Sequence, residues 1–170
     1  MSANFRIAPI SEAHIRGFGA AVDAVAREKR YLAMLRGFPP RMTREFVRAT
    51  LKRGNPHFVA LAGRRVIGWC DIQPVPRDTM IHSGILGMGV VKGFRGKGLG
   101  DALMAATLEA GRRFGLTRVE LTVREDNVRA KGLYEKHGFV VEGRKRDAVR
   151  VEGRYYDLFS MAVLFKRSGA

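Results

Sequence analysis

The stretch that decides the fold runs from Val90 to Gly100 and reads VVKGFRGKGLG. It predicts the end of a strand, a basic glycine-rich turn and the start of an amphipathic helix. Glycines let backbone N–H groups converge without interference from Cβ atoms. A helix N-terminus adds unpaired donors and the positive end of the helix dipole. With the charges of Arg95 and Lys97, the stretch predicts a site for a phosphate-bearing ligand such as a pyrophosphate.

The spacing of these glycines excludes the common phosphate loops. Gly93 and Gly98 have the spacing of a Walker loop, but Leu99 and Gly100 stand where that loop needs Lys and Ser or Thr. A dinucleotide fingerprint would need its third glycine one place after Gly100. A protein-kinase loop fails on the same spacing. Taken alone, the stretch also fits a turn that binds no ligand.

A second informative segment covers residues 119–141 and reads VELTVREDNVRAKGLYEKHGFVV. Alternation over its first residues predicts a strand. Asp126 or Asn127 can cap the following helix, and Gly138 can end that helix in a left-handed cap. Asn127 and Tyr134 are nearly two turns apart and so share one helix face. A structural cap and a core tyrosine would explain the same two residues.

Together the two segments resemble the GNAT family of N-acetyltransferases. Arg95-x-x-Gly98-x-Gly100 is similar to the R/Q-x-x-G-x-G/A signature of that family, and Tyr134-x-x-x-Gly138-Phe139 to its second motif. The resemblance implies acetyl-coenzyme A as cofactor. Its pyrophosphate would lie at the glycine turn, its pantetheine arm near Asn127 and a bulge at residues 88–90, and its thioester sulfur near Tyr134. The implied cofactor-binding residues are Met88, Gly89, Val90, Arg95, Gly96, Lys97, Gly98, Leu99, Gly100, Asp101, Asn127 and Tyr134.

The predicted elements follow the order β-α-α-β-β-β-α-β-α-β-β, which the resemblance equates with the GNAT fold. That fold is a mixed α/β arrangement, with a mostly antiparallel, splayed sheet of about seven strands flanked by about four helices. We expect strands at 4–10, 57–62, 65–73, 81–91, 118–123, 140–145 and 155–165, and helices from Ser11 through Leu32, from Thr43, at 99–115 and at 126–137.

Length and composition set the wider limits. The 170 residues fit one domain over 1–170, and an apolar content of 46% supports a sizeable core. No apolar run long enough to span a membrane and no secretory signal pattern is present, so we expect a cytoplasmic protein. The single Cys70 lies in an apolar run and is expected to be a core residue. The four histidines show no metal-ligand spacing, so no metal is expected.

The formal net charge of +15 is spread along the chain. Such a field favours polyanionic partners. Coenzyme A is one such partner, and nucleic acid or the ribosome surface is another, although no recognition motif for nucleic acid is present. An arginine-rich surface without a specific partner fits equally well. By analogy with the family, a homodimer is one option for the assembly.

The expected chemistry is direct attack of an amine on the acetyl thioester within a ternary complex. The amine must lose a proton, because an amine like that of lysine has a pKa near 10. A backbone N–H of Met88, Gly89 or Val90 could hold the oxyanion. Tyr134 is the candidate proton donor to the leaving thiolate.

The general base is less clearly marked. Some relatives carry a Glu where this chain has Thr122. Glu120 lies two residues earlier, on the same predicted strand face, and is our candidate, although a solvated surface charge is the simpler interpretation. The candidate acceptor-binding residues are Glu28, Trp69, Asp71 and Tyr155.

The acceptor stays open between small amines, amino acids, antibiotics and protein N-termini, because a fold does not fix a substrate. Transfer of another acyl group, or transfer to a hydroxyl, is a close alternative. A non-catalytic module that senses acyl-coenzyme A or docks on RNA is the alternative from another class.

Overall fold

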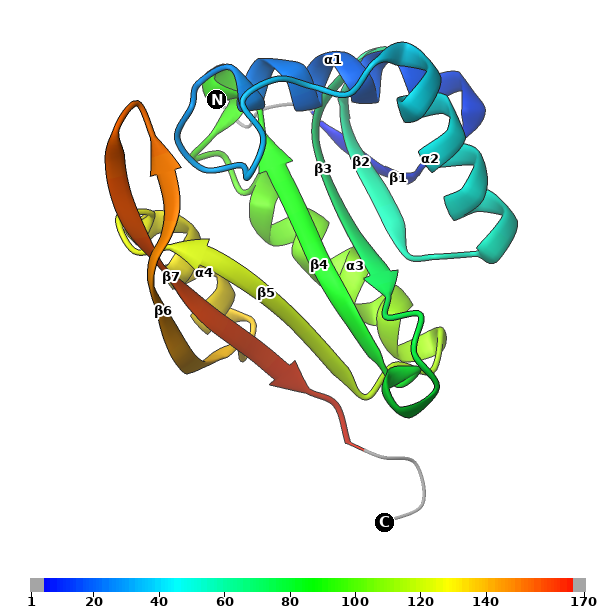
Figure 1. Cartoon of the computed structure of the whole chain (residues 1–170). Helices are drawn as coiled ribbons and strands as arrows, with labels where there is room; N and C mark the ends of the chain where they lie inside the picture. Colours follow the sequence, from blue (N-terminus) through cyan, green and yellow to red (C-terminus); the bar gives the residue numbers. More distant parts are fainter. Residues whose placement is uncertain (1–4, 167–170) are drawn as a thin grey trace.

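A seven-stranded sheet organises the chain, and helices cover both of its faces (Figure 1). The computed structural model describes residues 5–166. The strand order is β1-β2-β3-β4-β5-β7-β6, and all neighbours are antiparallel except β4 and β5. This confirms the predicted mixed, mostly antiparallel sheet. The strands are β1 Arg6–Pro9, β2 His57–Ala62, β3 Arg65–Pro74, β4 Ser83–Val90, β5 Arg118–Arg124, β6 Val140–Val151 and β7 Arg154–Leu164.

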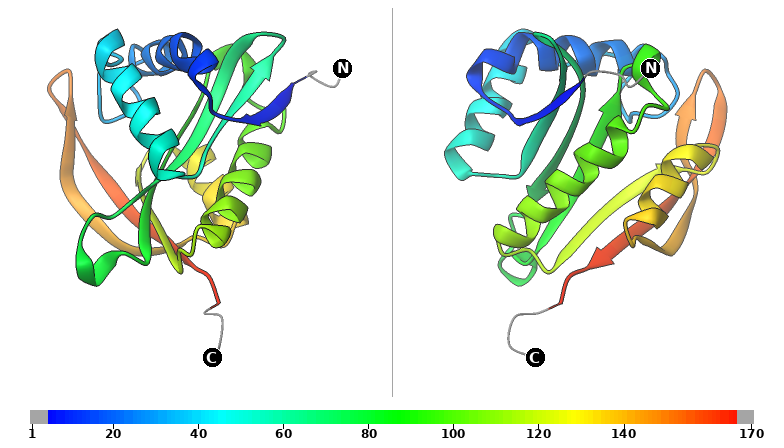
Figure 2. Two further views of the ribbon diagram at one scale, coloured as in Figure 1. Left: turned by 90° about the vertical axis from the view of Figure 1, so that its right-hand side faces the viewer. Right: turned by 180° about the vertical axis from the view of Figure 1, so that it is seen from behind.

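The helices divide between the two faces of the sheet. In Figure 1, α1 and α2 lie over β1–β3 on the face towards the viewer, and α3 and α4 lie behind the sheet. The view from behind in Figure 2 shows α3 and α4 in front of the strands. The α-helices are α1 Ile15–Ala26, α2 Pro40–Arg53, α3 Leu99–Arg113 and α4 Val128–Lys136, and the short 3-10 helices are η1 Glu12–His14, η2 Asp78–Met80 and η3 Lys92–Phe94.

Some element boundaries differ from those predicted. The prediction that the first helix continues to Leu32 is wrong, because α1 ends at Ala26 and Lys29 adopts a left-handed φ of 53° that no α-helix can contain. The next helix begins at Pro40 rather than Thr43, since proline at the first helical position has the required φ and needs no N–H partner. At the N-terminus, the predicted strand residue Asn4 lies outside the described residues.

Two apolar clusters fill the space between the sheet and its helices. The larger lies under α3 and contains fully buried Leu103, Met104 and Val119. The smaller lies under α1 and α2, where Phe18, Val47 and Trp69 meet. Cys70 is buried in the larger cluster, as predicted, and burial raises the pKa of its thiol far above the usual range. No helix among residues 5–166 is long and apolar enough to cross a membrane.

His57 on β2 is a buried polar residue within the smaller cluster. Its ring lies 4.9 Å from the Phe18 ring centroid, and neither ring nitrogen has a hydrogen-bond partner among the described residues. Burial therefore disfavours the charged form and lowers the pKa of His57 to about 3.

We expect the substitution His57→Phe to make folding stability less dependent on acid pH. The unfolded chain binds a proton at His57 below its ordinary pKa of 6.5, whereas the folded chain does so only near pH 3. The wild type should therefore lose stability as the pH falls through this window, by roughly 1.4 kcal/mol per pH unit at most. Urea unfolding between pH 7 and pH 4 measures this slope.

The matched control is His82→Phe, at an exposed histidine of the turn before β4. It should keep the wild-type slope. Equal slopes for His57→Phe and the wild type would show that His57 does not carry this pH dependence.

Candidate functional site

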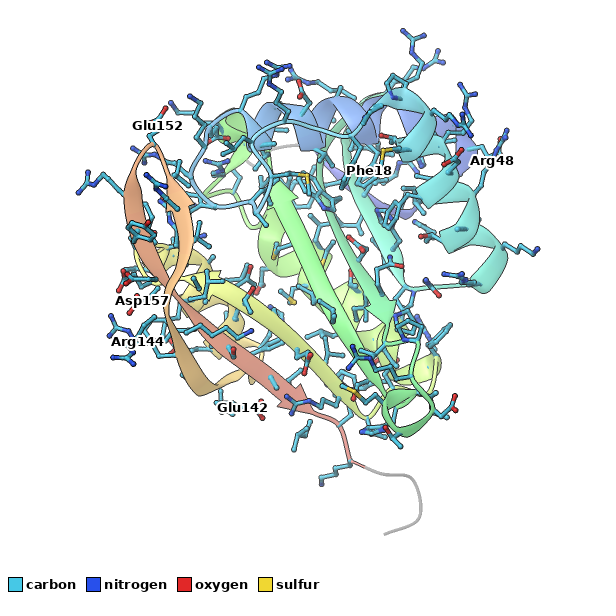
Figure 3. The ribbon with its side chains drawn as sticks, viewed as in Figure 1. Phe18, Arg48, Glu142, Arg144, Glu152 and Asp157 are labelled. Atoms are coloured by element: carbon cyan, nitrogen blue, oxygen red, sulfur yellow. The ribbon has the colours of Figure 1, made fainter. Side chains whose placement is uncertain are left out.

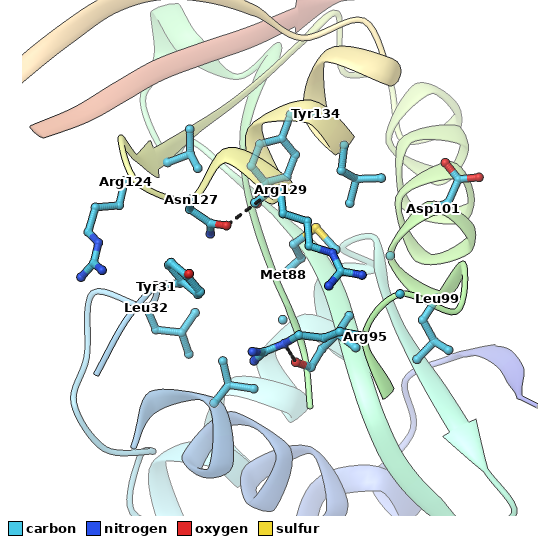
Figure 4. Close-up of a pocket in the computed structure, with 18 of the residues that line it drawn as sticks. Tyr31, Leu32, Met88, Arg95, Leu99, Asp101, Arg124, Asn127, Arg129 and Tyr134 are labelled. Carbon is cyan, nitrogen blue, oxygen red and sulfur yellow. Dashed lines mark hydrogen bonds between the residues drawn. The ribbon is translucent and has the colours of Figure 1, made fainter. Parts of the chain in front are cut away.

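A cavity of about 480 Å³ lies where β4 and β5 diverge (Figure 4). One wall is the glycine turn with the start of α3, and a second is α4 with its preceding loop. The remaining wall combines the ends of β4 and β5 with two residues of the α1–α2 loop, Tyr31 and Leu32. The cavity therefore joins segments that lie far apart in the sequence, from Val25 to Tyr134.

The strand divergence follows from how briefly β4 and β5 pair. Their parallel register covers three residue pairs, from Ser83 with Arg118 to Ile85 with Glu120. β4 then continues to Val90 without β5 beside it. Met88, Gly89 and Val90 line the cavity along this free edge. Backbone N–H and C=O groups need partners, so this edge can bind a ligand that carries amide groups, as another strand would.

The glycine turn has the conformation that the sequence predicted. Gly96 and Gly98 both have φ of +80°, a region that residues with a Cβ atom rarely adopt. Gly98 is the N-cap of α3, and no atom lies within 4 Å of the place where its Cβ would stand. The cavity is therefore open at the N-terminus of a 15-residue helix, where an anion is stabilised by free N–H groups and the helix dipole. This arrangement fits a diphosphate.

Arg95 lines the cavity, but its charge is already paired. Its guanidinium contacts the Glu28 carboxylate at 2.6 and 2.9 Å, and its Nε donates to the Val90 carbonyl oxygen at 2.8 Å. Arg95 thus joins the glycine turn to β4 and to the α1–α2 loop. Glu28, expected at the acceptor, holds this arginine and does not line the cavity.

The cations beside the turn are arranged differently from the prediction. Lys97 does not line the cavity, and its ammonium lies 5.6 Å from the centroid of the Phe94 ring. Arg129, which the sequence analysis missed, does line it. The Arg129 Nη2 atom lies 2.9 Å from the position that a Cβ on Gly96 would occupy. Arg129 therefore supplies a cation at the turn.

Asn127 and Tyr134 both face the cavity from α4, as their spacing predicted. Asn127 is the N-cap, and its side-chain oxygen accepts from the backbone N–H of Ala130 at 3.2 Å. Tyr134 is 8% exposed, with its ring 5.9 Å from that of Phe139. Burial raises the pKa of Tyr134 far above its usual range, so the phenol keeps its proton at neutral pH.

The other predicted residues lie outside the cavity wall. The Glu120 carboxylate is 3.0 Å from Arg118, which also binds Glu142 (Figure 3 labels Glu142). Thr122, on the same face of β5, does line the cavity. Tyr155 is 56% exposed on the β6–β7 hairpin.

Trp69 and Asp71 lie side by side on one face of β3, as their alternation predicted. A Cβ on Gly89 would stand 2.2 Å from the Trp69 ring, and one on Gly87 would stand 3.5 Å from Asp71 Oδ1. Trp69 is thus a packed core residue. Asp71 accepts from the Gln73 side chain at 2.9 Å, and burial raises the pKa of Asp71 to about 6.

The α1–α2 loop, residues 27–39, is tied down at several points. Asp23 accepts from the backbone N–H of Gly37 at 2.9 Å. Lys29 contacts Glu152 at 2.7 Å, at the turn of the β6–β7 hairpin labelled in Figure 3. With Glu28 on Arg95, these contacts hold Tyr31 and Leu32 against the cavity. Sequence periodicity could not predict these contacts, because the paired residues lie 14, 67 and 123 positions apart.

Arg124 is another cavity residue that sequence analysis missed. It ends β5, is 7% exposed and lies close to Tyr31 and Tyr156. An arginine that directly follows a predicted strand and precedes the Asn127 helix cap was an available signal.

Comparison with known proteins agrees with this geometry. A family model described as the acetyltransferase (GNAT) family matches residues 24–139. The chain is 31% identical over 110 residues to the L-amino acid N-acetyltransferase AaaT of Escherichia coli K12, a match that covers 64% of this chain and 68% of that protein.

Two solved structures with acetyl-coenzyme A share the fold. The structure of yncA from Salmonella typhimurium has a TM-score of 0.91 at 18% identity, with 98% of this chain and 96% of that one covered. A phosphinothricin acetyltransferase from Sinorhizobium meliloti has a TM-score of 0.87 at 19% identity, with 96% and 89% covered. The family model matches 116 of the 170 residues, and the site geometry and the shared fold agree with that match. The chain therefore belongs to the GNAT family of acetyltransferases.

Proposed function

We propose that the chain transfers an acetyl group from acetyl-coenzyme A to an amine by direct attack while both substrates occupy the cavity. Acetyl-coenzyme A-dependent N-acetyl transfer is the chemistry of the GNAT family. The observation that carries the proposal is that one cavity joins an anion-binding helix N-terminus, a free strand edge and a buried tyrosine.

The residues present fit acetyl-coenzyme A. The turn at Gly96–Asp101 and the Arg129 guanidinium would hold its diphosphate, because backbone donors and a cation converge there. The free β4 edge at Met88–Val90 and the Asn127 side chain would hold its pantetheine amides. When bound, the molecule supplies an activated acetyl thioester.

Tyr134 is our proposed proton donor to the sulfur as the carbon–sulfur bond breaks. Tyr134 lines the cavity, and its hydroxyl keeps its proton because burial disfavours the phenolate. A hydroxyl in this position stabilises the charge that develops on sulfur before it gives up its proton.

The proton of the attacking amine must go to a carboxylate, directly or through water. Glu120 remains a candidate, but its carboxylate is engaged by Arg118. We propose Asp71 for this role. Asp71 is paired with Gly87 on β4, the residue that precedes Met88 of the cavity wall. Because Gly87 has no Cβ atom, no side chain at this position covers the Asp71 carboxylate. Its pKa of about 6 suits a base at neutral pH.

We predict that Gly98→Ala weakens acetyl-coenzyme A binding at least tenfold. A Cβ atom at a φ of +80° strains the turn by about 1–2 kcal/mol and projects into the space for the diphosphate. Titration calorimetry with acetyl-coenzyme A measures the effect. The matched control is Gly93→Ala, at a glycine with ordinary φ, open surroundings and no place in the cavity wall. Equal affinity of the two variants would contradict the placement of the diphosphate.

We predict that Tyr134→Phe lowers kcat about 10- to 100-fold with little change in acetyl-coenzyme A affinity. The substitution removes the hydroxyl and keeps the ring that packs on Phe139. Thiol release gives kcat, and calorimetry gives the affinity. Unchanged kcat would remove Tyr134 from the mechanism.

We predict an acid limb in kcat/KM near pH 6 that Asp71→Asn abolishes and Glu120→Gln preserves. The Asp71 carboxylate must be ionised to accept a proton, so activity should rise with pH through its pKa of about 6. Loss of the limb in Glu120→Gln alone would instead identify Glu120 as the base.

Thermal unfolding separates this effect from misfolding. The pKa of Asp71 is raised in the folded chain above its ordinary value of 3.8, so its ionisation destabilises the fold increasingly from about pH 4 to pH 6 and fully above that. Asp71→Asn should therefore be at least as stable as the wild type at pH 8.

A further inference from the structure

We propose that Arg124 binds a carboxylate of the acceptor, which makes the acceptor an amino acid or a closely similar amine with a carboxylate next to its amino group. This inference rests on the proposed acetyl transfer and names its substrate class.

Arg124 stands at the opposite end of the cavity from the glycine turn. Figure 4 shows its side chain beside Tyr31 and across the cavity from Leu99 and Asp101. It shares one face of β5 with Thr122, which also lines the cavity. An acceptor that enters between the α1–α2 loop and β5 would meet the Arg124 side chain.

The guanidinium of Arg124 is oriented by three neighbours. Asp126 accepts from its Nε at 2.6 Å and from its Nη2 at 2.7 Å. Its Cζ lies 4.0 Å from the Tyr156 ring centroid and 5.5 Å from that of Tyr31. One edge of the guanidinium is thus occupied by Asp126, and two aromatic rings of the protein lie close to it. This leaves little freedom to the side chain.

The Nη1 end of the guanidinium is still available. An arginine has five N–H donors, and Asp126 uses two of them. No hydrogen-bond acceptor for Nη1 is found among residues 5–166. Nη1 and the second hydrogen of Nη2 form a pair that matches the two oxygens of a carboxylate. Because the side chain is already held in place, binding such a group costs little conformational entropy.

The charges around the cavity favour a carboxylate over other anchors. Three arginines and one acidic residue, Asp101, line it. Asp101 is paired with Lys136 and His137 at 2.8 Å, next to the turn. Arg95 is paired with Glu28, and Arg129 stands at the turn. Arg124 is therefore the cavity-lining cation at the acceptor end, although Asp126 already pairs with one edge of its guanidinium. Apart from Asp101 at the turn, no acidic residue among those that the structure describes lines the wall.

The first test is an acceptor panel. Thiol release from acetyl-coenzyme A is measured with the twenty L-amino acids and, for the best of them, with its carboxamide and with the amine that lacks the carboxylate. We expect the amino acid to exceed both analogues at least tenfold in kcat/KM. A best acceptor without a carboxylate, or no acetylation of any amino acid, would overturn the inference.

The second test compares arginine variants with the same acceptors. Arg124→Gln should raise KM for the amino acid at least 30-fold and change kcat/KM for the amine less than threefold. Each acceptor is compared between the wild type and the variant at one pH, so differences in amine pKa between acceptors do not affect the result. Arg124→Lys, which keeps the charge and loses the paired donors, should fall between. An equal loss for all acceptors would show that Arg124 has only a structural role.

The matched control is Arg112→Gln. Arg112 also contacts one aromatic ring, that of Phe165 at 4.3 Å, and one carboxylate, that of Glu109 at 3.6 Å, but lies outside the cavity wall. It should leave every acceptor unchanged. Acetyl-coenzyme A affinity, measured by calorimetry, should be the same in all variants. Absence of that binding in the wild type would contradict the proposed function itself, whereas binding without a carboxylate preference contradicts only the role of Arg124.

Discussion

The short pairing of β4 with β5 is the constraint on which the rest of the site depends. Two parallel strands that separate after three residue pairs leave a backbone edge with unmet hydrogen-bonding groups. A folded protein tolerates such an edge where a ligand or water can reach it. Here the glycine turn continues directly from that edge, so the same divergence opens the cavity and places the N-terminus of α3 at its end. Gly89 contributes as well, because its missing side chain leaves room for the six-membered ring of Trp69 beside the strand.

The α1–α2 loop completes the cavity through charge pairs rather than through secondary structure. The contact of Glu28 with Arg95 is the best shielded of these, with both side chains about one-quarter exposed or less. The contact of Lys29 with Glu152 is more exposed and worth less, since water and salt screen it. The loop is thus held firmly beside the glycine turn and more loosely beside the β6–β7 hairpin. Arg95, which the sequence suggested as a ligand for phosphate, lines the cavity and also links β4 to the α1–α2 loop.

What the sequence could predict was local. The glycine turn, the Asn127 cap and the left-handed Gly138 depend on a few adjacent residues, and the structure has all three. The pairing of Arg95 with Glu28 joins residues that lie 67 positions apart, which no periodicity reveals. Arg124 illustrates the limit most clearly, because its aromatic neighbours are remote from it in sequence. Tyr156 reaches it through the pairing of β5 with β7, and Tyr31 comes from the α1–α2 loop.

The high net charge acts at longer range than these contacts. Two of the three arginines in the cavity wall are paired with carboxylates, so the wall carries much less charge than a formal +15 suggests. Much of the excess lies outside it, as on β6, where Lys145, Arg146 and Arg150 lie close together in the sequence. A diffuse positive field of this kind speeds the arrival of an anionic ligand and is screened by salt. In the proposed complex, selectivity would therefore depend on the few groups with fixed geometry, which are the N–H groups of the turn at one end and the oriented guanidinium of Arg124 at the other.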